Sequence, residues 1–224
     1  MPDQPTIVFD LDGTLADSIP DIVGALNRTL EKMQLAPTTP TKVAHLTANG
    51  GLRAMIAQAC AESCLSFAQQ DLDDAFNATV KDYDQNIAVD TALYPGVTAS
   101  LEVFRSNGWL LAICTNKPVA QATKLLGALN IEHQFSAITG FDSFAFKKPD
   151  PRHLTRTIEL AGGRTDRAIM VGDTKTDVLT AQNAGIPVVA VDFGYSDLDV
   201  RTLAPSGVIS GFDALFAQAA KLVR

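Results

Sequence analysis

Short apolar runs that stop at polar or glycine residues recur along the chain, and they predict buried parallel strands. The first run is Thr6-Ile7-Val8-Phe9, which ends abruptly at Asp10. Three further runs of this kind occupy residues 109–113, 168–171 and 187–191. Weaker runs at 137–139 and 208–209 would extend the same sheet.

Helical patterns lie between these runs. Apolar residues recur with a spacing near ~3.6 over 119–129, 154–161 and 178–184. Gly162-Gly163 and Gly185 follow two of these segments, where glycine suits a helix C-terminus. Strand alternating with helix predicts an α/β fold, a doubly wound Rossmann-like parallel sheet with helices on both faces.

The region from about residue 19 to residue 87 interrupts this alternation. It offers no convincing strand, only helical segments near 22–35, 52–64 and 72–86. A helical insertion after the first strand is the simplest account, and Tyr94-Pro95-Gly96 marks the return. We therefore expect an α/β core formed by residues 1–17 and 90–224, and a helical domain formed by 18–89.

Composition narrows the class of protein. The 224 residues are 46% hydrophobic and carry a formal net charge of -7, which disfavours a nucleic-acid backbone as partner. Three cysteines are too few for a disulfide framework, which favours a reducing cytoplasm. No stretch has the apolar length of a membrane span, and the N-terminus lacks the basic start of a signal peptide. We expect a cytoplasmic protein without nucleic-acid or membrane partners.

Polar side chains gather where the predicted strands end, and ligands of doubly wound sheets bind at that edge. These residues are Asp10, Asp12, Thr115, Asn116, Asp173 and Asp177. Four carboxylates in one crevice would repel one another without a cation. Oxygen ligands favour Mg²⁺ over zinc, and no His-Cys cluster competes for a softer metal. His45, His133 and His153 show no ligand spacing and are expected at surface or satisfied loop positions.

Each motif also has a simpler interpretation. Asp10 and Asp12 precede a turn at Gly13, and such a pair suits covalent catalysis in which one carboxylate is the nucleophile and the other the acid. The simpler interpretation is that Asp12-Gly13-Thr14 is only a loop whose residues favour a turn. Asp177 lies one helical turn after Asp173, although acidic residues favour helix N-termini in any case.

Two further motifs could bind an anion. Thr115-Asn116, before Lys117-Pro118, would present a hydroxyl and backbone N–H groups at a helix start, or simply cap that helix. A lysine in the loop Lys147-Lys148-Pro149 would neutralise crowded carboxylates and bind a phosphoryl oxygen, or be a solvated charge.

Together, these four motifs in this order resemble the haloacid dehalogenase superfamily of aspartyl-phosphate enzymes, over nearly the whole chain. The resemblance implies that Asp10 is the nucleophile and Asp12 the general acid and base. It implies Mg²⁺ held by Asp10, the main-chain carbonyl of Asp12 and Asp173, with Asp177 as a further ligand or support. Thr115, Asn116 and Lys148 would bind the phosphoryl group, and Lys148 would also balance the charge of Asp10. The lysine of the family motif precedes a proline, which selects Lys148 over Lys147.

The helical insertion resembles the cap domain of this superfamily, and the cap is implied to select the substrate. Within it, the loop formed by Asn49, Gly50, Gly51 and Arg53 is the candidate contact, since two glycines allow close approach and Arg53 could bind a carboxylate. The simpler interpretation, a break between helices followed by a surface arginine, is favoured for Arg53.

The resemblance implies a Mg²⁺-dependent phosphatase of a small phosphorylated metabolite, with 2-phosphoglycolate as the leading substrate. Asp12 argues against dehalogenase and phosphonate chemistry, which dispense with the second acid. A sugar-phosphate mutase or a pyrophosphatase on the same scaffold remains open, as does a non-catalytic phospho-acceptor module. We expect a monomer or a homodimer.

Overall fold

The computed structural model describes residues 4–47, 50–63 and 65–223. Its contacts divide the chain into two compact units, one formed by Met1–Asp17 with Ala92–Arg224 and the other by Ser18–Thr91. Asn49 and Cys64 lie outside the described residues. We call the first unit the core unit and the second the helical unit.

The core unit is built on a six-stranded parallel sheet with the order β5-β4-β1-β6-β7-β8. Its strands are β1 Thr6–Phe9, β4 Leu110–Cys114, β5 Ala137–Thr139, β6 Ala168–Gly172, β7 Val188–Val191 and β8 Gly207–Ile209. When only these six strands are numbered along the chain, their order in the sheet is 3-2-1-4-5-6, the arrangement of a doubly wound sheet. The direction of winding reverses beside β1. The predicted fold class is confirmed.

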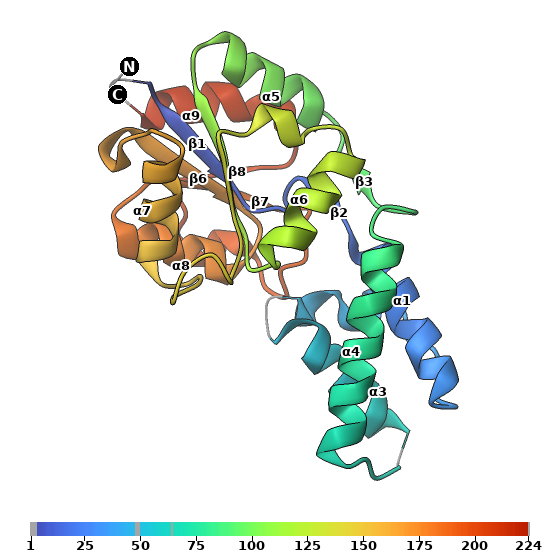
Figure 1. The fold of residues 1–224 in the computed structure, drawn as a ribbon. Coiled ribbons are helices and arrows are strands. Elements are labelled where there is room, and N and C mark those ends of the chain that lie inside the picture. Colours follow the sequence, from blue (N-terminus) through green and yellow to red (C-terminus); the bar gives the residue numbers. More distant parts are fainter. Residues whose placement is uncertain (1–3, 48–49, 64, 224) are drawn as a thin grey trace. The chain divides into compact units, whose positions relative to one another are not determined.

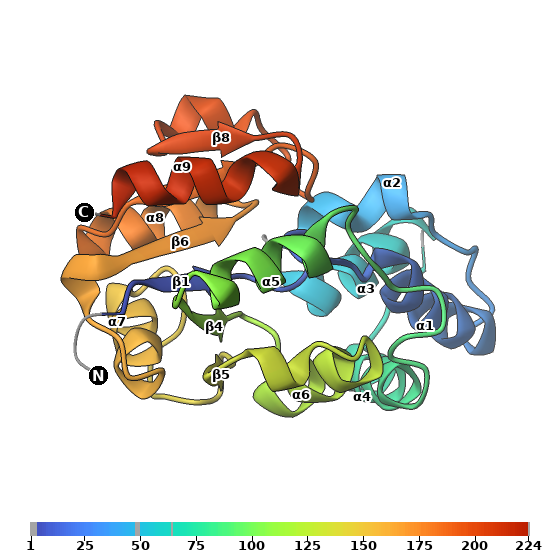
Figure 2. The ribbon, with the colours of Figure 1, turned by 90° about the horizontal axis from the view of Figure 1, so that it is seen from above.

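Helices cover both faces of this sheet. α5 and α9 lie on one face, and α7 and α8 lie on the other (Figure 2). The helices of the core unit are α5 Val97–Ser106, α6 Val119–Ala128, α7 Pro151–Leu160, α8 Lys175–Ala184 and α9 Leu215–Leu222. Because the central strands β1, β6 and β7 are covered on both sides, every residue in them is buried. This explains why their sequences are continuous apolar runs.

The sheet register brings the strand ends to one line. Phe9 at the end of β1 lies opposite Ile113 of β4 and Val171 of β6. The residues that follow these strands therefore emerge at the same edge, beside the point where the winding reverses. This is the position at which doubly wound sheets bind their ligands.

The helical unit consists of α1 Ile19–Lys32, α2 Pro40–Val43, α3 Gly51–Glu62 and α4 Gln69–Gln85 (Figure 1). Thr79 of α4 donates a hydrogen bond from its hydroxyl to that of Thr29 of α1, at 2.9 Å in the buried contact between the helices. Asp21 in the first turn of α1 accepts hydrogen bonds from the backbone N–H groups of Val89, Asp90 and Thr91. That carboxylate ties the end of the unit to its beginning.

The element boundaries differ from the predicted ones mainly at helix starts. α1 begins at Ile19 rather than near residue 22, because Pro20 suits the first turn of a helix. α7 begins at Pro151, where a helix start was expected, after Asp150, whose side chain accepts a hydrogen bond from Arg152 N at 2.9 Å. The short antiparallel pair β2 Ala16–Asp17 and β3 Ala92–Leu93 was not predicted. None of the helices in the described part of the chain has the length and apolarity needed to cross a membrane.

Candidate active site

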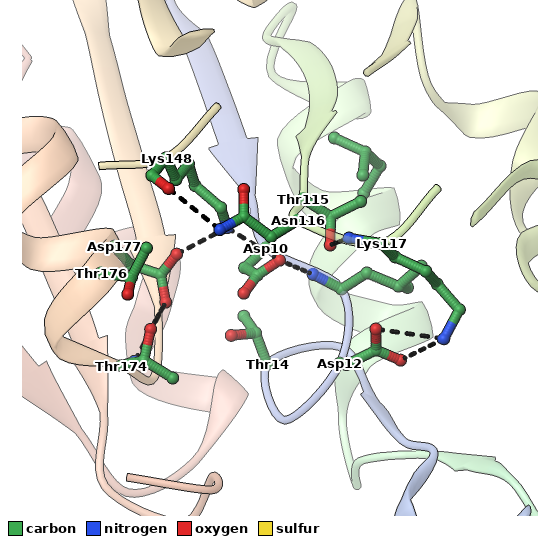
Figure 3. Close-up of polar contacts among 12 residues, drawn as sticks. Asp10, Asp12, Thr14, Thr115, Asn116, Lys117, Lys148, Thr174, Thr176 and Asp177 are labelled. Atoms are coloured by element: carbon green, nitrogen blue, oxygen red, sulfur yellow. Dashed lines mark hydrogen bonds and ion pairs between the residues drawn. The ribbon is translucent and has the colours of Figure 1, made fainter. Parts of the chain in front are cut away.

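A buried lysine joins two carboxylates, one directly after β1 and the other in the first turn of α8 (Figure 3). The Nζ atom of Lys148 lies 3.0 Å from Asp10 Oδ1 and 2.7 Å from Asp177 Oδ1. The side chain of Lys148 is 1% exposed. Burial on its own lowers the pKa of Lys148, but the charges of Asp10 and Asp177 outweigh burial and shift this pKa upward. Lys148 is therefore a permanent positive charge between two acids.

Asp173 follows β6 and is held by backbone and side-chain donors. Thr14 Oγ1 donates to Asp173 Oδ1 at 2.8 Å, and Tyr195 N donates to Asp173 Oδ2 at 2.7 Å. A Cβ atom at Gly13 would lie 2.4 Å from Asp173 Oδ2, and one at Gly194 would lie 2.3 Å from Asp173 Cβ. Glycine at both positions lets two loops close around this carboxylate.

Three carboxylates converge at this point. Oxygen atoms of Asp10, Asp173 and Asp177 all lie within 4.8 Å of one another, and all three residues are buried. Burial raises the pKa of Asp10 from the usual 3.8 to about 6, because the charge of Lys148 offsets only part of it and Asp177 adds repulsion. Burial and the charges of Asp177 and Asp10 raise the pKa of Asp173 well above its usual value.

These observations fit a hard divalent cation. The donor set is oxygen only, and the acids are close enough to share one ion. Burial and mutual repulsion raise the pKa values of Asp10 and Asp173, so a cation would stabilise their charged forms. We conclude that the cluster can hold a metal such as Mg²⁺.

Asp177 also has a structural role. It occupies the third position of α8 and accepts hydrogen bonds from Thr174 N at 3.0 Å and from Thr174 Oγ1 at 2.6 Å. This capping box matches the simpler interpretation of an acid at a helix N-terminus. The other oxygen, Oδ1, contacts Lys148. The carboxylate of Asp177 therefore both caps α8 and pairs with Lys148.

The acids whose oxygen atoms lie within 4.8 Å of one another do not include Asp12. Its two carboxylate oxygens lie 3.0 and 3.2 Å from Nζ of Lys117 (Figure 3). Gly13 N donates to Ala16 O at 2.9 Å, and this tight turn carries Asp12. Asp10 thus belongs to the cluster, whereas Asp12 pairs with a different lysine.

The backbone of Lys148 is held on both sides. Its N–H donates to Nδ1 of His153 at 3.2 Å, and its carbonyl accepts from Nδ2 of Asn116 at 3.0 Å. The peptide bond between Lys148 and Pro149 is cis. His153 was expected at the surface or in a loop, but it is fully buried in α7 because it packs beneath this loop. Burial and the nearby charge of Lys148 lower its pKa to about 4, so its ring is neutral at neutral pH.

Thr115 and Asn116 lie where β4 ends, as the register requires. The side chain of Asn116 contacts the lysine loop, and Thr115 Oγ1 accepts a hydrogen bond from Lys117 N at 3.2 Å. The structure therefore brings the second and third motifs together. Their role in binding a phosphoryl group stays a prediction.

In the helical unit, the candidate loop precedes α3. Gly50 and Gly51 adopt left-handed backbone angles, with φ of 107° and 60°. Arg53 pairs with Asp73 at 2.6 Å, and its guanidinium lies 4.0 Å from the ring centre of Phe76. This exposed pair matches the interpretation of Arg53 as a surface charge.

Three residues of the core site were not among the predicted site residues. Thr14 and Tyr195 hold Asp173, and Lys117 holds Asp12. Each had a signal in the sequence, because Thr14 ends the first motif, Lys117 directly follows the second and Tyr195 follows the strand β7. The sequence did not indicate which carboxylate each of these residues contacts.

The structure places clustered aspartates and a buried lysine at the ligand-binding edge of a doubly wound sheet. Residues 7–191 match the family model described as haloacid dehalogenase-like hydrolase. The chain belongs to this family.

Its relatives narrow the class further. A phosphoglycolate phosphatase of Mesorhizobium japonicum is 48% identical over 222 residues, which cover 99% of this chain and 97% of that protein. A phosphoglycolate phosphatase of Agrobacterium fabrum is 41% identical over 96% of this chain and 91% of its own. A crystal structure described as a predicted phosphoglycolate phosphatase from Haemophilus somnus 129pt superposes with a TM-score of 0.90 at 27% identity, covering 97% of this chain and 98% of that one. The chain is accordingly a phosphoric monoester hydrolase of the haloacid dehalogenase type.

Proposed function

We propose that the protein is a Mg²⁺-dependent phosphatase that hydrolyses a small phosphomonoester through a phosphoaspartate on Asp10. The observation that carries this proposal is the environment of Asp10. Leu11 N donates a hydrogen bond to Asp10 Oδ1 at 2.7 Å, and Lys148 Nζ lies 3.0 Å from the same oxygen. Oδ2 is the oxygen that attacks in the proposal.

In the first half of the reaction, Oδ2 of Asp10 attacks phosphorus and the bond to the ester oxygen breaks. The electron pair of that bond leaves with the ester oxygen, to which the Asp12 carboxyl gives a proton. Lys148 stays positive and offsets the charge that gathers between Asp10 and the phosphoryl oxygens.

In the second half, the Asp12 carboxylate takes a proton from a water molecule, and the water oxygen attacks the same phosphorus. The bond between phosphorus and Asp10 breaks, which returns the free carboxylate and inorganic phosphate. A bound Mg²⁺ supplies further positive charge for the phosphoryl oxygens. In this proposal Asp10, the main-chain carbonyl of Asp12 and Asp173 hold that ion, while Asp177 fixes Lys148. Thr115 and Asn116 bind the phosphoryl group.

The relatives named phosphoglycolate phosphatases support 2-phosphoglycolate as the substrate. We further propose that the helical unit is the cap that selects the substrate. The candidate contact with the substrate is the loop of Asn49, Gly50, Gly51 and Arg53, of which Asn49 lies outside the described residues. The protein would then act on a small metabolite in the cytoplasm, as a monomer or a homodimer.

A panel of phosphorylated metabolites tests the proposed function. We expect phosphate release from 2-phosphoglycolate to exceed release from hexose phosphates and pyrophosphate, and to stop when EDTA removes the metal. Conversion of a hexose phosphate into its isomer would support a mutase instead, and preferred cleavage of pyrophosphate would support a pyrophosphatase. A stable phosphorylated Asp10 without turnover would support a non-catalytic module.

The raised pKa values predict how Mg²⁺ stabilises the protein. Because the pKa of Asp10 is about 6 in the folded, metal-free site, the folded state binds this proton more tightly than the unfolded chain. The metal-free protein should therefore lose stability as pH rises from about 4 to about 6. Mg²⁺ competes with the same proton, so its stabilising effect should be larger at about pH 7.5 than at about pH 5.

Thermal denaturation with and without Mg²⁺ measures this effect. At a concentration of about 100 times its dissociation constant, the ion should stabilise the protein by about 2.7 kcal/mol. The matched control is Asp173→Asn, which keeps a side chain of the same size and should lose most of the shift. An equal shift at both pH values would contradict the assignment of the cluster as the metal site.

A further inference from the structure

Lys117 is a second buried lysine at the carboxyl edge of the sheet. Its side chain is 5% exposed, and its Nζ atom contacts both carboxylate oxygens of Asp12, at 3.0 and 3.2 Å. Figure 3 shows this pair apart from the one that Lys148 makes with Asp10 and Asp177. Lys148 thus pairs with Asp10 and Asp177, whereas Lys117 pairs with Asp12.

The backbone of Lys117 is fixed. Its N–H donates to Thr115 Oγ1 at 3.2 Å, and its carbonyl accepts from Phe141 N at 3.2 Å. Gly140 packs against the same carbonyl, since a Cβ atom there would lie 2.5 Å from Lys117 O. The main chain that carries this side chain is thus held in place, and the burial of the side chain limits the positions open to its ammonium group.

The side chain of Asp12 is less buried than that of Lys117. Its side chain is 19% exposed, and it stands on the turn closed by Gly13. A carboxylate at such a position could adopt several rotamers. Contact of one ammonium group with both oxygens selects the rotamer and orients the plane of the carboxylate.

We propose that Lys117 is a positioning residue for Asp12, which sets the orientation in which the carboxyl group meets the leaving oxygen and the attacking water. This inference rests on the proposed function, because it requires Asp12 to be the acid and base. Proton transfer depends on placing the carboxyl oxygen within hydrogen-bond reach of its target, and displacement by about 1 Å can cost about 100-fold in rate.

Two substrates whose leaving groups differ in their need for a proton test this proposal. 2-Phosphoglycolate releases a basic alkoxide that needs a proton, whereas p-nitrophenyl phosphate releases a stable phenolate that does not. Lys117→Met removes the charge but keeps a long side chain. We expect it to lower kcat/KM for 2-phosphoglycolate by about 10- to 100-fold and for p-nitrophenyl phosphate by less than about threefold.

A double-mutant cycle separates this inference from the proposed function. Asp12→Asn alone should show the same dependence on the leaving group, and Lys117→Met should add little to it because both act through one carboxyl. If Asp12→Asn lacks this dependence, the role of Asp12 in the proposed function fails. If Asp12→Asn has it and Lys117→Met does not, only the role of Lys117 fails.

Two controls distinguish the positioning of Asp12 from a general loss of positive charge and from a loss of substrate binding. Lys147→Met removes an exposed positive charge from the neighbouring lysine loop and should leave both substrates unaffected. 2-Hydroxyethyl phosphate has an alkoxide leaving group but no carboxylate, so Lys117→Met should impair it as it impairs 2-phosphoglycolate. A rise in KM confined to 2-phosphoglycolate would overturn the proposal, because it would mean that Lys117 binds the substrate carboxylate.

Discussion

Replacing Asp10 with asparagine is expected to lower kcat by roughly 10⁴-fold or more, the largest effect of any single substitution in this protein. An amide oxygen is a far weaker nucleophile than a carboxylate, and no phosphoaspartate can form without that carboxylate. Steady-state phosphate release from 2-phosphoglycolate in the presence of Mg²⁺ measures the loss.

The stability of the same variant serves as its control. Burial raises the pKa of Asp10, so the ionised carboxylate destabilises the metal-free folded state at neutral pH. Asparagine carries no charge, and Lys148 keeps its contact with Asp177. We expect Asp10→Asn without metal to melt at or above the temperature of the original protein. Undiminished turnover by this folded variant would disprove covalent catalysis at Asp10.

Lys148→Met is expected to cost both activity and stability. The substitution leaves Asp10 and Asp177 buried without the lysine that lies 3.0 and 2.7 Å from them. Breaking a buried ion pair from one side typically costs about 3–5 kcal/mol. Urea denaturation without metal should show a loss of this size, and turnover should fall by at least about 100-fold because the phosphoryl charge loses its counter-charge.

Lys147→Met is the matched control, since this neighbouring lysine is exposed. Substitutions at exposed positions usually change stability by less than about 0.5 kcal/mol. Equal effects of the two substitutions would contradict the choice of Lys148 as the lysine of the site.

Much of the core fold could be predicted from the sequence, because its strands are buried on both faces and so appear as continuous apolar runs. The predicted run Thr6–Phe9 has the same bounds as the strand β1. Two core helices, α5 and α9, were not among the predicted elements. Val97, Leu101 and Phe104 of α5 do have helical spacing and are buried, so the signal was present.

The sequence could predict which strand ends meet, but not which side chains pair there. Parallel strands end at one edge, so Asp10, Thr115 and Asp173 had to come together once the strands were recognised. The orientation of Asp12 could not be predicted in this way, because its partner Lys117 is 105 positions away and belongs to a different strand-helix junction. Ion pairs of this kind depend on rotamers, and local sequence does not specify them.

The most direct test of the central claim is whether phosphate becomes covalently attached to Asp10 during turnover. Asp12→Asn removes the proposed general base, but p-nitrophenyl phosphate should still transfer its phosphoryl group because its leaving group needs no proton. Mass spectrometry after a rapid acid quench should then find one phosphoryl group on the peptide that contains Asp10. Release of p-nitrophenolate by this variant with an unmodified Asp10 at every time point would contradict the account.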